Sequence, residues 1–345
     1  MNANASLLAL SENITRLTSD YIQLVTYSLC VVVGLPFNLI TLCSLLKRYK
    51  CSRSAILLLQ INLNISDLCV LCLFCMTWIP WIITIQWHGG AFLCLFLRFT
   101  DLFVFALSSN IVVCIAIDRL YTLRRPLRVK ISSYRVHKMI LLAWVLAIVC
   151  ASPQLVVWKQ VNFTYDEGSF TQCISVWLEL TLQDRITRKH ELWRDIYSTY
   201  HVLVIFWIPL AILVVSYVLI VKAIYNTLRT EKGQPVIFLK DTTNSGSALI
   251  LRTSSGSGRI RRARSRSLRI TLILITVYVL TWLPYNTLTF WNVIHHRSYT
   301  VHENTLYVLH GLNVLNSVIN PFIYGRWRSI DYLRRLTKCL GCTRF

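Results

Sequence analysis

The chain has 345 residues, of which 55% are hydrophobic and 15% are charged, and its formal net charge at pH 7 is +21. A water-soluble domain with this balance would expose too much apolar surface, so the composition indicates a membrane protein. In a soluble protein such a charge would suggest nucleic-acid binding, but here the basic residues lie in short segments between apolar stretches. We therefore expect one membrane domain and no nucleic-acid partner.

Several apolar stretches are long enough to cross about 30 Å of hydrocarbon. In chain order they run over Ile22–Lys47, Ala55–Ile83, Phe92–Arg124, Val136–Val157, Ile196–Leu228, Leu268–Ile294 and Asn304–Tyr324. Every backbone polar group must be satisfied internally in lipid, which favours helices. The sequence thus predicts an all-α membrane protein, a seven-transmembrane helix bundle, with the membrane lipid as one of its partners.

The rest of the chain divides into short polar segments. We expect a tail over 1–21, the seven-span domain over 22–326 with a Ser-, Thr- and Gly-rich connection at 229–261, and a final segment at 327–345. Apolar and basic residues alternate in that final segment, which is typical of an amphipathic helix on the cytoplasmic membrane surface. Cys339 and Cys342 near its end are candidates for palmitoylation.

Basic residues also predict the orientation. The first, third and fifth connections and the C-terminal tail carry clusters of Lys and Arg, and all of them lie on one side if the spans alternate. The N-terminus is then outside and the C-terminus is in the cytoplasm, as in a multi-pass protein of the plasma membrane. The glycosylation sequons at Asn4, Asn13 and Asn162 fall on the outer side, whereas the one at Asn64 lies inside a span.

Each span contains a marker residue or a short motif. In order they are Asn38, Asp67, Asp118-Arg119-Leu120, Trp144, Pro209 with Tyr217, Trp282-Leu283-Pro284, and Asn320-Pro321-Phe322-Ile323-Tyr324. Charged groups inside a membrane are costly and mark function, and a proline there removes a backbone hydrogen bond. Together the motifs resemble those of rhodopsin-like G-protein-coupled receptors. The resemblance implies activation of a heterotrimeric G protein, and no nucleophile–base pair or metal spacing indicates an enzyme.

The resemblance assigns an activation switch to the motifs. It implies that Arg119, beside Asp118, is released on activation and meets the G protein. The other residues of this switch are Tyr217, Trp282, Pro284, Asn320, Pro321 and Tyr324. The position that usually supplies an acid to Arg119 at the base of the sixth span is Arg264, so we expect ligand-free activity unless Tyr217, Tyr278 or a loop supplies another restraint.

Asp67 is a carboxylate inside a span and therefore needs partners or a cation. By resemblance, it lines a sodium- and water-filled cavity. The residues that share this cavity are Ser108, Asn316, Ser317 and Asn320. The alternative is a protonated Asp67 that is hydrogen-bonded to Asn38 and Asn320. Sodium is the only cofactor that the sequence suggests.

The residues expected at the ligand site mix polar groups with aromatic rings, which suits a peptide. They are Trp78, Asp101, Trp282, Tyr285, Asn286, Phe290, His310 and Asn313. Asp101 lies where amine receptors of the family place their cation-binding acid. Two roles stay open for it, a counter-ion for a ligand cation or a local partner for Arg98.

Cys94 and Cys173 lie at the start of the third span and in the second outer loop. Both face the oxidising side, so we expect a disulfide between them. Finer motifs, such as Leu63-Asn64-Ile65-Ser66-Asp67 and Gln86-Trp87, resemble the gonadotropin-releasing-hormone, adipokinetic-hormone and corazonin receptors. That branch implies an extracellular (neuro)peptide ligand and coupling to the Gq class. The alternatives are a biogenic amine or other small cationic ligand bound by Asp101, and a seven-span transporter-like protein that does not signal.

Overall fold

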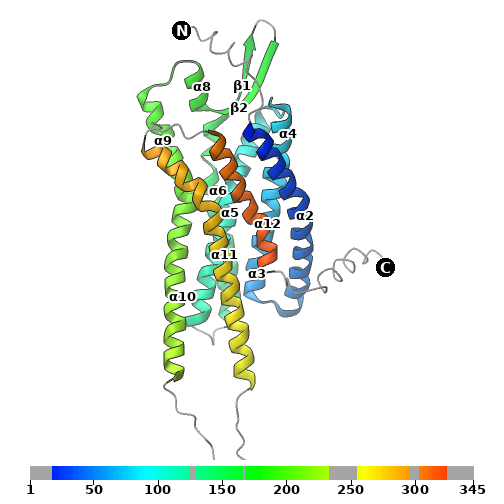
Figure 1. Cartoon of the computed structure of the whole chain (residues 1–345), viewed down its shortest axis with the longest axis vertical. Coiled ribbons are helices and arrows are strands. Elements are labelled where there is room, and N and C mark those ends of the chain that lie inside the picture. The colour runs from blue at the N-terminus through cyan, green and yellow to red at the C-terminus, as the bar shows by residue number, and fades with distance from the viewer. Residues whose placement is uncertain (1–17, 125–128, 166–167, 233–254, 296–302, 325–345) are drawn as a thin grey trace, which may run out of the picture.

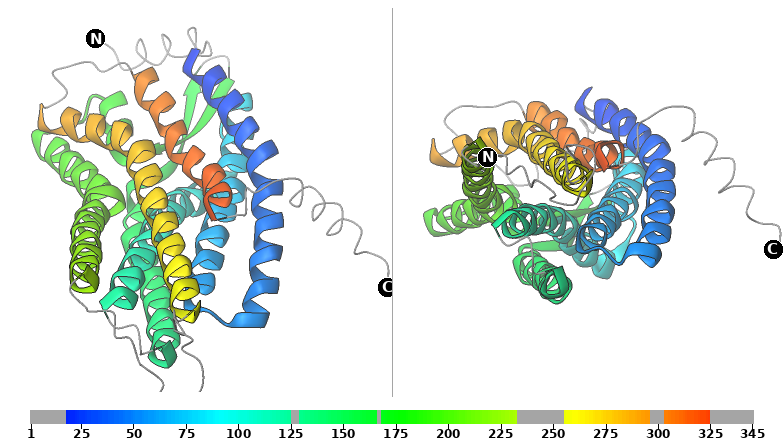
Figure 2. Two further views of the ribbon diagram at one scale, coloured as in Figure 1. Left: turned by 60° about the horizontal axis from the view of Figure 1, so that its bottom comes forward. Right: turned by 90° about the horizontal axis from the view of Figure 1, so that it is seen from below.

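The computed structural model describes residues 18–124, 129–165, 168–232, 255–295 and 303–324. Within these residues, seven helices are long and apolar enough to cross a membrane, and they stand together as one bundle (Figures 1 and 2). Their segments are α2 (Thr18–Ser52), α3 (Ala55–Cys69) with η1 (Val70–Cys75) and α4 (Met76–Thr84), α5 (Gly90–Arg124), α6 (Val129–Ala151) with α7 (Gln154–Val157), α9 (Arg188–Val202) with η2 (Leu203–Trp207) and α10 (Ile208–Lys232), α11 (Ser255–Ile294), and α12 (Glu303–Tyr324). The predicted seven-helix bundle is confirmed.

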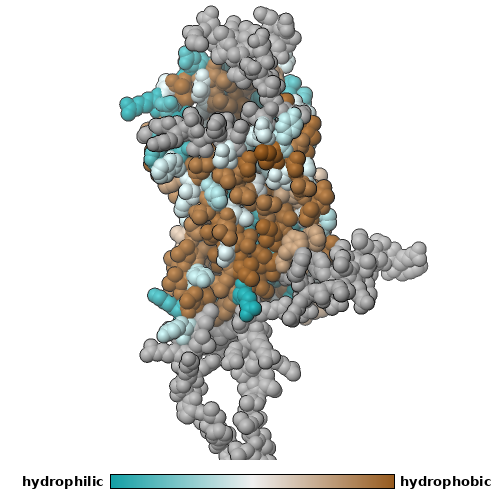
Figure 3. Space-filling model, viewed as in Figure 1, coloured by the Kyte–Doolittle hydropathy of each residue, from teal (hydrophilic) through white to brown (hydrophobic). Residues whose placement is uncertain are grey.

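The outside of the bundle is apolar between its two ends. Hydrophobic residues cover the middle of the face shown in Figure 3, and hydrophilic residues lie toward the ends. Large apolar side chains on several helices are more than half exposed, among them Val32, Leu141, Val149, Val215 and Leu280. A soluble protein rarely exposes so large an apolar surface, whereas lipid tails cover it without cost.

Helix α5 forms the centre of the bundle. In its most apolar stretch 78% of the residues are buried, against 28% in the corresponding stretch of α2. It packs against α3, α6, α10 and α11, so its side chains can link helices that do not touch one another. The outlying α2 approaches its neighbours closely at Gly34, where an added Cβ would lie 2.9 Å from Val318 and 3.0 Å from Leu71.

Two of the spanning helices contain a π-helical stretch, η1 and η2, which the sequence did not predict. Each wide turn takes up one extra residue, and one residue corresponds to about 100° of rotation around an α-helix. The part of the helix beyond η1 is therefore turned relative to α3. In this orientation Trp78 and Trp81 of α4 lie against Arg98 of α5. Such π-helical turns occur frequently at functional sites.

A β-hairpin covers one end of the bundle, which we call the hairpin end (Figure 1). Strand β1 (Trp158–Tyr165) pairs antiparallel with β2 (Gly168–Ser175), and the short helix α8 (Val176–Leu182) follows. The predicted disulfide between Cys94 and Cys173 is present and ties β2 to the start of α5. The sequence predicted only a long loop here, although the β-branched and aromatic residues of β1 are typical of a strand.

Candidate functional site

Arg98 and Asp101 form an ion pair in α5 near the hairpin end. Arg98 Nη1 lies 3.2 Å from Asp101 Oδ2, and the two side chains are only 7% and 13% exposed. Trp78 Nε1 donates a hydrogen bond to the same carboxylate oxygen at 3.3 Å. Of the two roles considered for Asp101, the local pairing is formed in this structure. A contact between Asp101 and a ligand stays a prediction.

Three tryptophan rings surround the Arg98 guanidinium. Its central carbon lies 4.3, 4.6 and 5.1 Å from the ring centres of Trp78, Trp81 and Trp158, within the range of cation–π attraction. Trp81 also donates a hydrogen bond of 3.1 Å to Gln172 of β2. The cluster therefore joins α4, α5 and both strands of the hairpin. Sequence reasoning missed Trp158 and Gln172 because nothing placed the hairpin over α5.

A second cluster of rings is centred on His310 of α12. The His310 ring lies 5.0 Å from Tyr285 and 5.4 Å from Phe105, and its Nδ1 is 3.4 Å from the Tyr27 hydroxyl. Phe105 continues the contact to Trp282, whose ring centre is 5.6 Å away. Three of the predicted ligand residues, Tyr285, His310 and Trp282, thus belong to one continuous set of aromatic contacts.

The other predicted ligand residues have different surroundings. Asn286 is buried and donates its side-chain hydrogen bond to the carbonyl of Trp282 on its own helix at 2.8 Å. Phe290 lies against Trp207 of η2, with ring centres 5.7 Å apart. Asn313 is buried in α12. The hydrogen bond of Asn286 and the ring contact of Phe290 are thus separate from the Arg98–Asp101 cluster.

Several buried polar atoms in this half of the bundle have no hydrogen-bond partner among the described residues. Four of them are Arg98 Nε, Asp101 Oδ1, Trp207 Nε1 and Asn313 Oδ1. A buried polar atom is costly unless it is hydrogen-bonded, and native structures leave few such atoms unsatisfied. These four atoms are therefore suited to hydrogen-bond the polar groups of a ligand.

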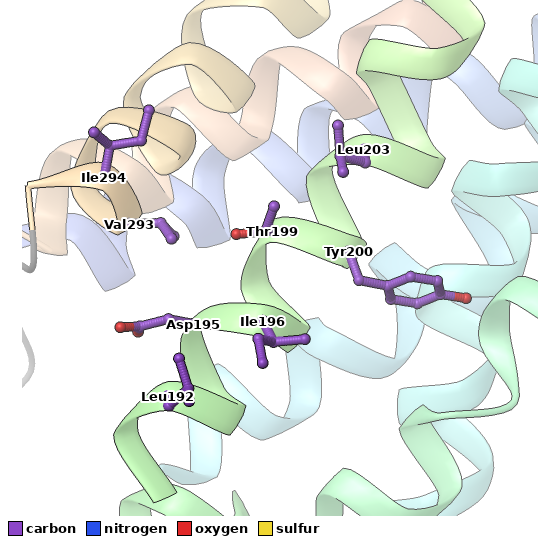
Figure 4. A pocket seen from close by; sticks show the side chains of 8 residues that line it. All are labelled: Leu192, Asp195, Ile196, Thr199, Tyr200, Leu203, Val293 and Ile294. Carbon is purple, nitrogen blue, oxygen red and sulfur yellow. The ribbon is translucent and has the colours of Figure 1, made fainter. Parts of the chain in front are cut away.

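A pocket of about 510 Å³ lies apart from these clusters, between α9 and α11 (Figure 4). Its lining consists of Leu192, Asp195, Ile196, Thr199, Tyr200, Leu203, Val293 and Ile294. None of the predicted ligand residues contributes to it. Its one acid, Asp195, pairs with Arg194 at 3.3 Å. The pocket is therefore an apolar groove at the edge of the bundle rather than the predicted ligand site.

Midway along the bundle, Asp67 and Asn320 lie together in full burial. Asn320 Nδ2 is 3.1 Å from each Asp67 carboxylate oxygen. Asn38 accepts a hydrogen bond from Asn64 at 2.7 Å and donates to the backbone of Ser317 at 3.1 Å. These contacts connect α2, α3 and α12. The sequon at Asn64 is buried, as its place inside a span predicted.

Two further predicted cavity residues keep unsatisfied polar atoms. Within the described residues, Ser108 Oγ and both side-chain polar atoms of Asn316 are buried without a hydrogen-bond partner. Hydroxyl, amide and carboxylate oxygens are the ligands that hard cations take. Together with Asp67 these groups fit a sodium ion, although sodium binding itself stays a prediction.

Near the end of the bundle away from the hairpin, Asp118 pairs with two arginines. Its fully buried carboxylate contacts Arg119, as predicted, and lies 2.8 Å from Arg135 Nη2 of α6. The Arg135 guanidinium also stacks 3.6 Å over the Tyr121 ring. Sequence reasoning assigned Arg135 only to a basic connection, because its place beside Asp118 depends on how α6 packs on α5.

The model of the 7 transmembrane receptor (rhodopsin family) matches residues 22–324. The chain belongs to this family. It is 28% identical to the G-protein coupled receptor daf-38 of Caenorhabditis elegans, over 89% of this chain and 88% of that relative. It is 30% identical to a gonadotropin-releasing hormone receptor of Octopus vulgaris, over 81% of this chain and 64% of the relative. It is 28% identical to the Mus musculus gonadotropin-releasing hormone receptor, over 81% of this chain and 78% of that relative.

Membership makes this chain a signalling receptor rather than an enzyme. Of the remaining switch residues, Pro284 and Pro321 lie inside α11 and α12, and Tyr217 on α10 is 42% exposed and thus outside the packed core. Asn162 is exposed on β1, where a glycan could attach. The predicted sites Asn4, Asn13, Cys339 and Cys342 and the side chains of Arg264 and Tyr324 lie outside the described residues, as does the predicted amphipathic helix.

Proposed function

We propose that this receptor lies in the plasma membrane, binds an extracellular peptide at the hairpin end and activates a heterotrimeric G protein at the opposite end. In this proposal the N-terminus is outside, the C-terminus is cytoplasmic, and the Gq class is among the G proteins engaged. The named gonadotropin-releasing hormone receptors among the relatives support a peptide hormone as the ligand.

The observation that carries the peptide assignment is the Arg98–Asp101 pair beneath the hairpin. An amine receptor needs an acid whose charge is available to the ligand, but here Arg98 already neutralises Asp101. A second cation beside Arg98 would be repelled. Unsatisfied donors and acceptors instead lie on α5, η2 and α12, from Asp101 to Trp207 and Asn313. A ligand with many hydrogen-bonding groups spread along its length meets these requirements better than a small amine.

The opposite end supports coupling to a G protein. There Arg119 is held by Asp118, and Asp118 also contacts Arg135. Release of Arg119 from Asp118 would make its permanently charged guanidinium available to a partner. This is the role that the family resemblance implies. The transporter-like alternative gains no support, because the buried charges form separate clusters rather than a path along the bundle.

The test is a ligand screen on cells that express the full chain. Libraries of neuropeptides and of biogenic amines would be applied separately, and activation of each Gα class would be read with energy-transfer sensors. We expect a peptide to activate at least one class, and we expect Arg119→Ala to bind that peptide without activating the sensor. Activation by amines alone would overturn the peptide assignment. A peptide that binds but activates no Gα class would overturn the coupling.

A further inference from the structure

A polar junction joins three helices in the middle of the bundle, around the side chain of Tyr278. This α11 residue is fully buried, and its hydroxyl lies 3.1 Å from Ser109 Oγ of α5 and 3.1 Å from the carbonyl of Ile205 in η2. A buried hydroxyl is costly unless it is hydrogen-bonded, so these two contacts link α11 to α5 and η2 in the interior of the bundle.

The chemistry of the three groups fixes the direction of both bonds. A carbonyl can only accept, so the single phenolic proton goes to Ile205 and the Ser109 hydroxyl donates to the phenolic oxygen. Pro209 follows Ile205 by one α-helical turn and has no N–H for that carbonyl. The Tyr278 hydroxyl therefore satisfies an acceptor that the helix itself leaves without its usual donor.

The junction is continuous with the ring contacts of the ligand half. Tyr278 stacks on Trp282 with ring centres 5.3 Å apart, and Trp282 reaches His310 through Phe105. Pro284 lies within α11 just beyond Trp282 and interrupts the hydrogen bonding of that helix. A displacement at His310 can thus reach Tyr278 through packed rings, and the part of α11 that carries Tyr278 can tilt about Pro284.

We propose that the Tyr278 hydroxyl is a positioning group that holds α11 against α5 and η2 in the resting receptor and lets go on activation. These two contacts restrain α11 at Ser109 and Ile205, whereas Arg119 is held separately by Asp118. Hydrogen bonds at this distance are directional, so a small tilt of α11 breaks both of them. The inference rests on the proposed signalling function but not on the class of ligand.

The test compares variants of the full-length receptor purified in lipid nanodiscs. A fluorescent amino acid replaces the exposed Arg269, which lies on the opposite side of Tyr278 from Pro284 in α11, and reports how this part of the helix moves. Tyr278→Phe removes both hydrogen bonds, whereas Ser109→Ala leaves the bond to Ile205. Thr276→Val is the matched control, because it removes an exposed α11 hydroxyl that bonds only within its own helix, to Leu272 at 2.9 Å.

We expect Tyr278→Phe to shift the emission of the reporter and to raise ligand-free G-protein activation in cells at least about five-fold, because the loss of even one buried hydrogen bond produces about this change. Ser109→Ala should give a smaller increase, and adding it to Tyr278→Phe should change nothing further. Thr276→Val should match the unmodified receptor.

The two readouts separate this inference from the proposed function. A shifted emission without activation of any Gα class would support the restraint and overturn the coupling to G proteins. A lower melting temperature for Tyr278→Phe with unchanged emission and signalling would show that the hydroxyl only stabilises the fold, and this would overturn the inference. If the effects of Tyr278→Phe and Ser109→Ala added in the double variant, the two residues would not act through one junction. That result would also overturn the inference.

Discussion

At Asp101, an experiment can separate a structural ion pair from a ligand contact without knowledge of the ligand. Asp101→Asn would leave the buried Arg98 without its counter-ion, and breaking such a pair typically costs about 3–5 kcal/mol. We expect this variant to lose surface expression and thermal stability. The double variant Arg98→Gln with Asp101→Asn should recover both, because no uncompensated charge remains.

Surface staining and thermal melting of the purified receptor would measure the effect. Normal expression of Asp101→Asn would contradict the structural pair and favour an acid that is reserved for a ligand cation. The Trp78 indole, which donates to Asp101 in the structure, can donate equally to an asparagine oxygen. Its hydrogen bond therefore does not complicate the comparison.

Single residues show how far the sequence alone could lead. It identified Asp118, Arg119, Asp67 and Asn320, because charged and amide groups inside apolar spans stand out. It also offered Tyr278 as a possible restraint, but Ser109 is 169 positions away and nothing in the sequence showed that the two residues meet. Contacts of that kind depend on helix packing, which apolar periodicity does not determine.

At the scale of elements, the disulfide fixes the hairpin to the start of α5. We expect Cys173→Ser to lower both surface expression and melting temperature, since loss of a native disulfide commonly costs about 2–5 kcal/mol. Cys43→Ser is the control, because Cys43 is a free, exposed cysteine on α2. Equal melting of both variants, together with no mass change of the unmodified receptor on reduction and alkylation, would contradict the bond.

The contact of α3 with α12 at Asp67 supports a prediction about sodium. An ion bound to the folded receptor stabilises it by mass action. We therefore expect the purified receptor to melt a few degrees higher in sodium chloride than in choline chloride at equal ionic strength, roughly the shift that about 1 kcal/mol produces. Asp67→Asn should abolish the difference.

Two outcomes would count against this sodium site. One is equal melting of the unmodified receptor in both salts. The other is a sodium effect that survives in Asp67→Asn, which would place the ion elsewhere. Replacement of Ser108 by alanine should weaken the effect without abolishing it, since Ser108 would contribute one oxygen whereas Asp67 contributes the charge.

The elements themselves were only partly predictable. The apolar stretches predicted all seven spans, because crossing a bilayer demands length and hydrophobicity that are visible in the sequence. The π-helical turns η1 and η2 were not predicted, since one extra residue per turn leaves no compositional trace. They nevertheless decide which faces of α4 and of η2 point toward the ligand half, where Trp78, Trp81 and Trp207 lie.

On the scale of the whole molecule, the buried polar groups form three levels along the bundle. The Arg98–Asp101 pair lies near the hairpin, Asp67 with Asn320 lies near the middle, and the Asp118 cluster lies near the opposite end. Between the first two levels, aromatic rings lead from His310 to Trp282 and Tyr278. These contacts form a continuous path of packed rings that leads to Tyr278 rather than to the Asp118 level.

The balance at the Asp118 level predicts ligand-free signalling. Asp118 is shared between Arg119 and Arg135, and their like charges repel, so the carboxylate holds Arg119 less firmly than it would hold it alone. The resemblance to rhodopsin-like receptors also implies that Arg264 stands where an acid is usual. We expect G-protein activation above that of mock-transfected cells. Both Arg264→Glu and Arg135→Gln should reduce this activation, and Arg119→Ala should abolish it.

Energy-transfer sensors for each Gα class, read at equal surface expression, would measure this basal signal. A change of about 1.4 kcal/mol in the equilibrium between resting and active receptor alters the active population about ten-fold. Even a modest gain in how firmly Arg119 is held would therefore lower the basal signal measurably. Lys138→Gln is the control for loss of a positive charge on α6, because Lys138 lies over Tyr134 rather than beside Asp118. Basal activation equal to that of mock cells, with no response to Arg264→Glu or Arg135→Gln, would contradict the prediction of ligand-free signalling.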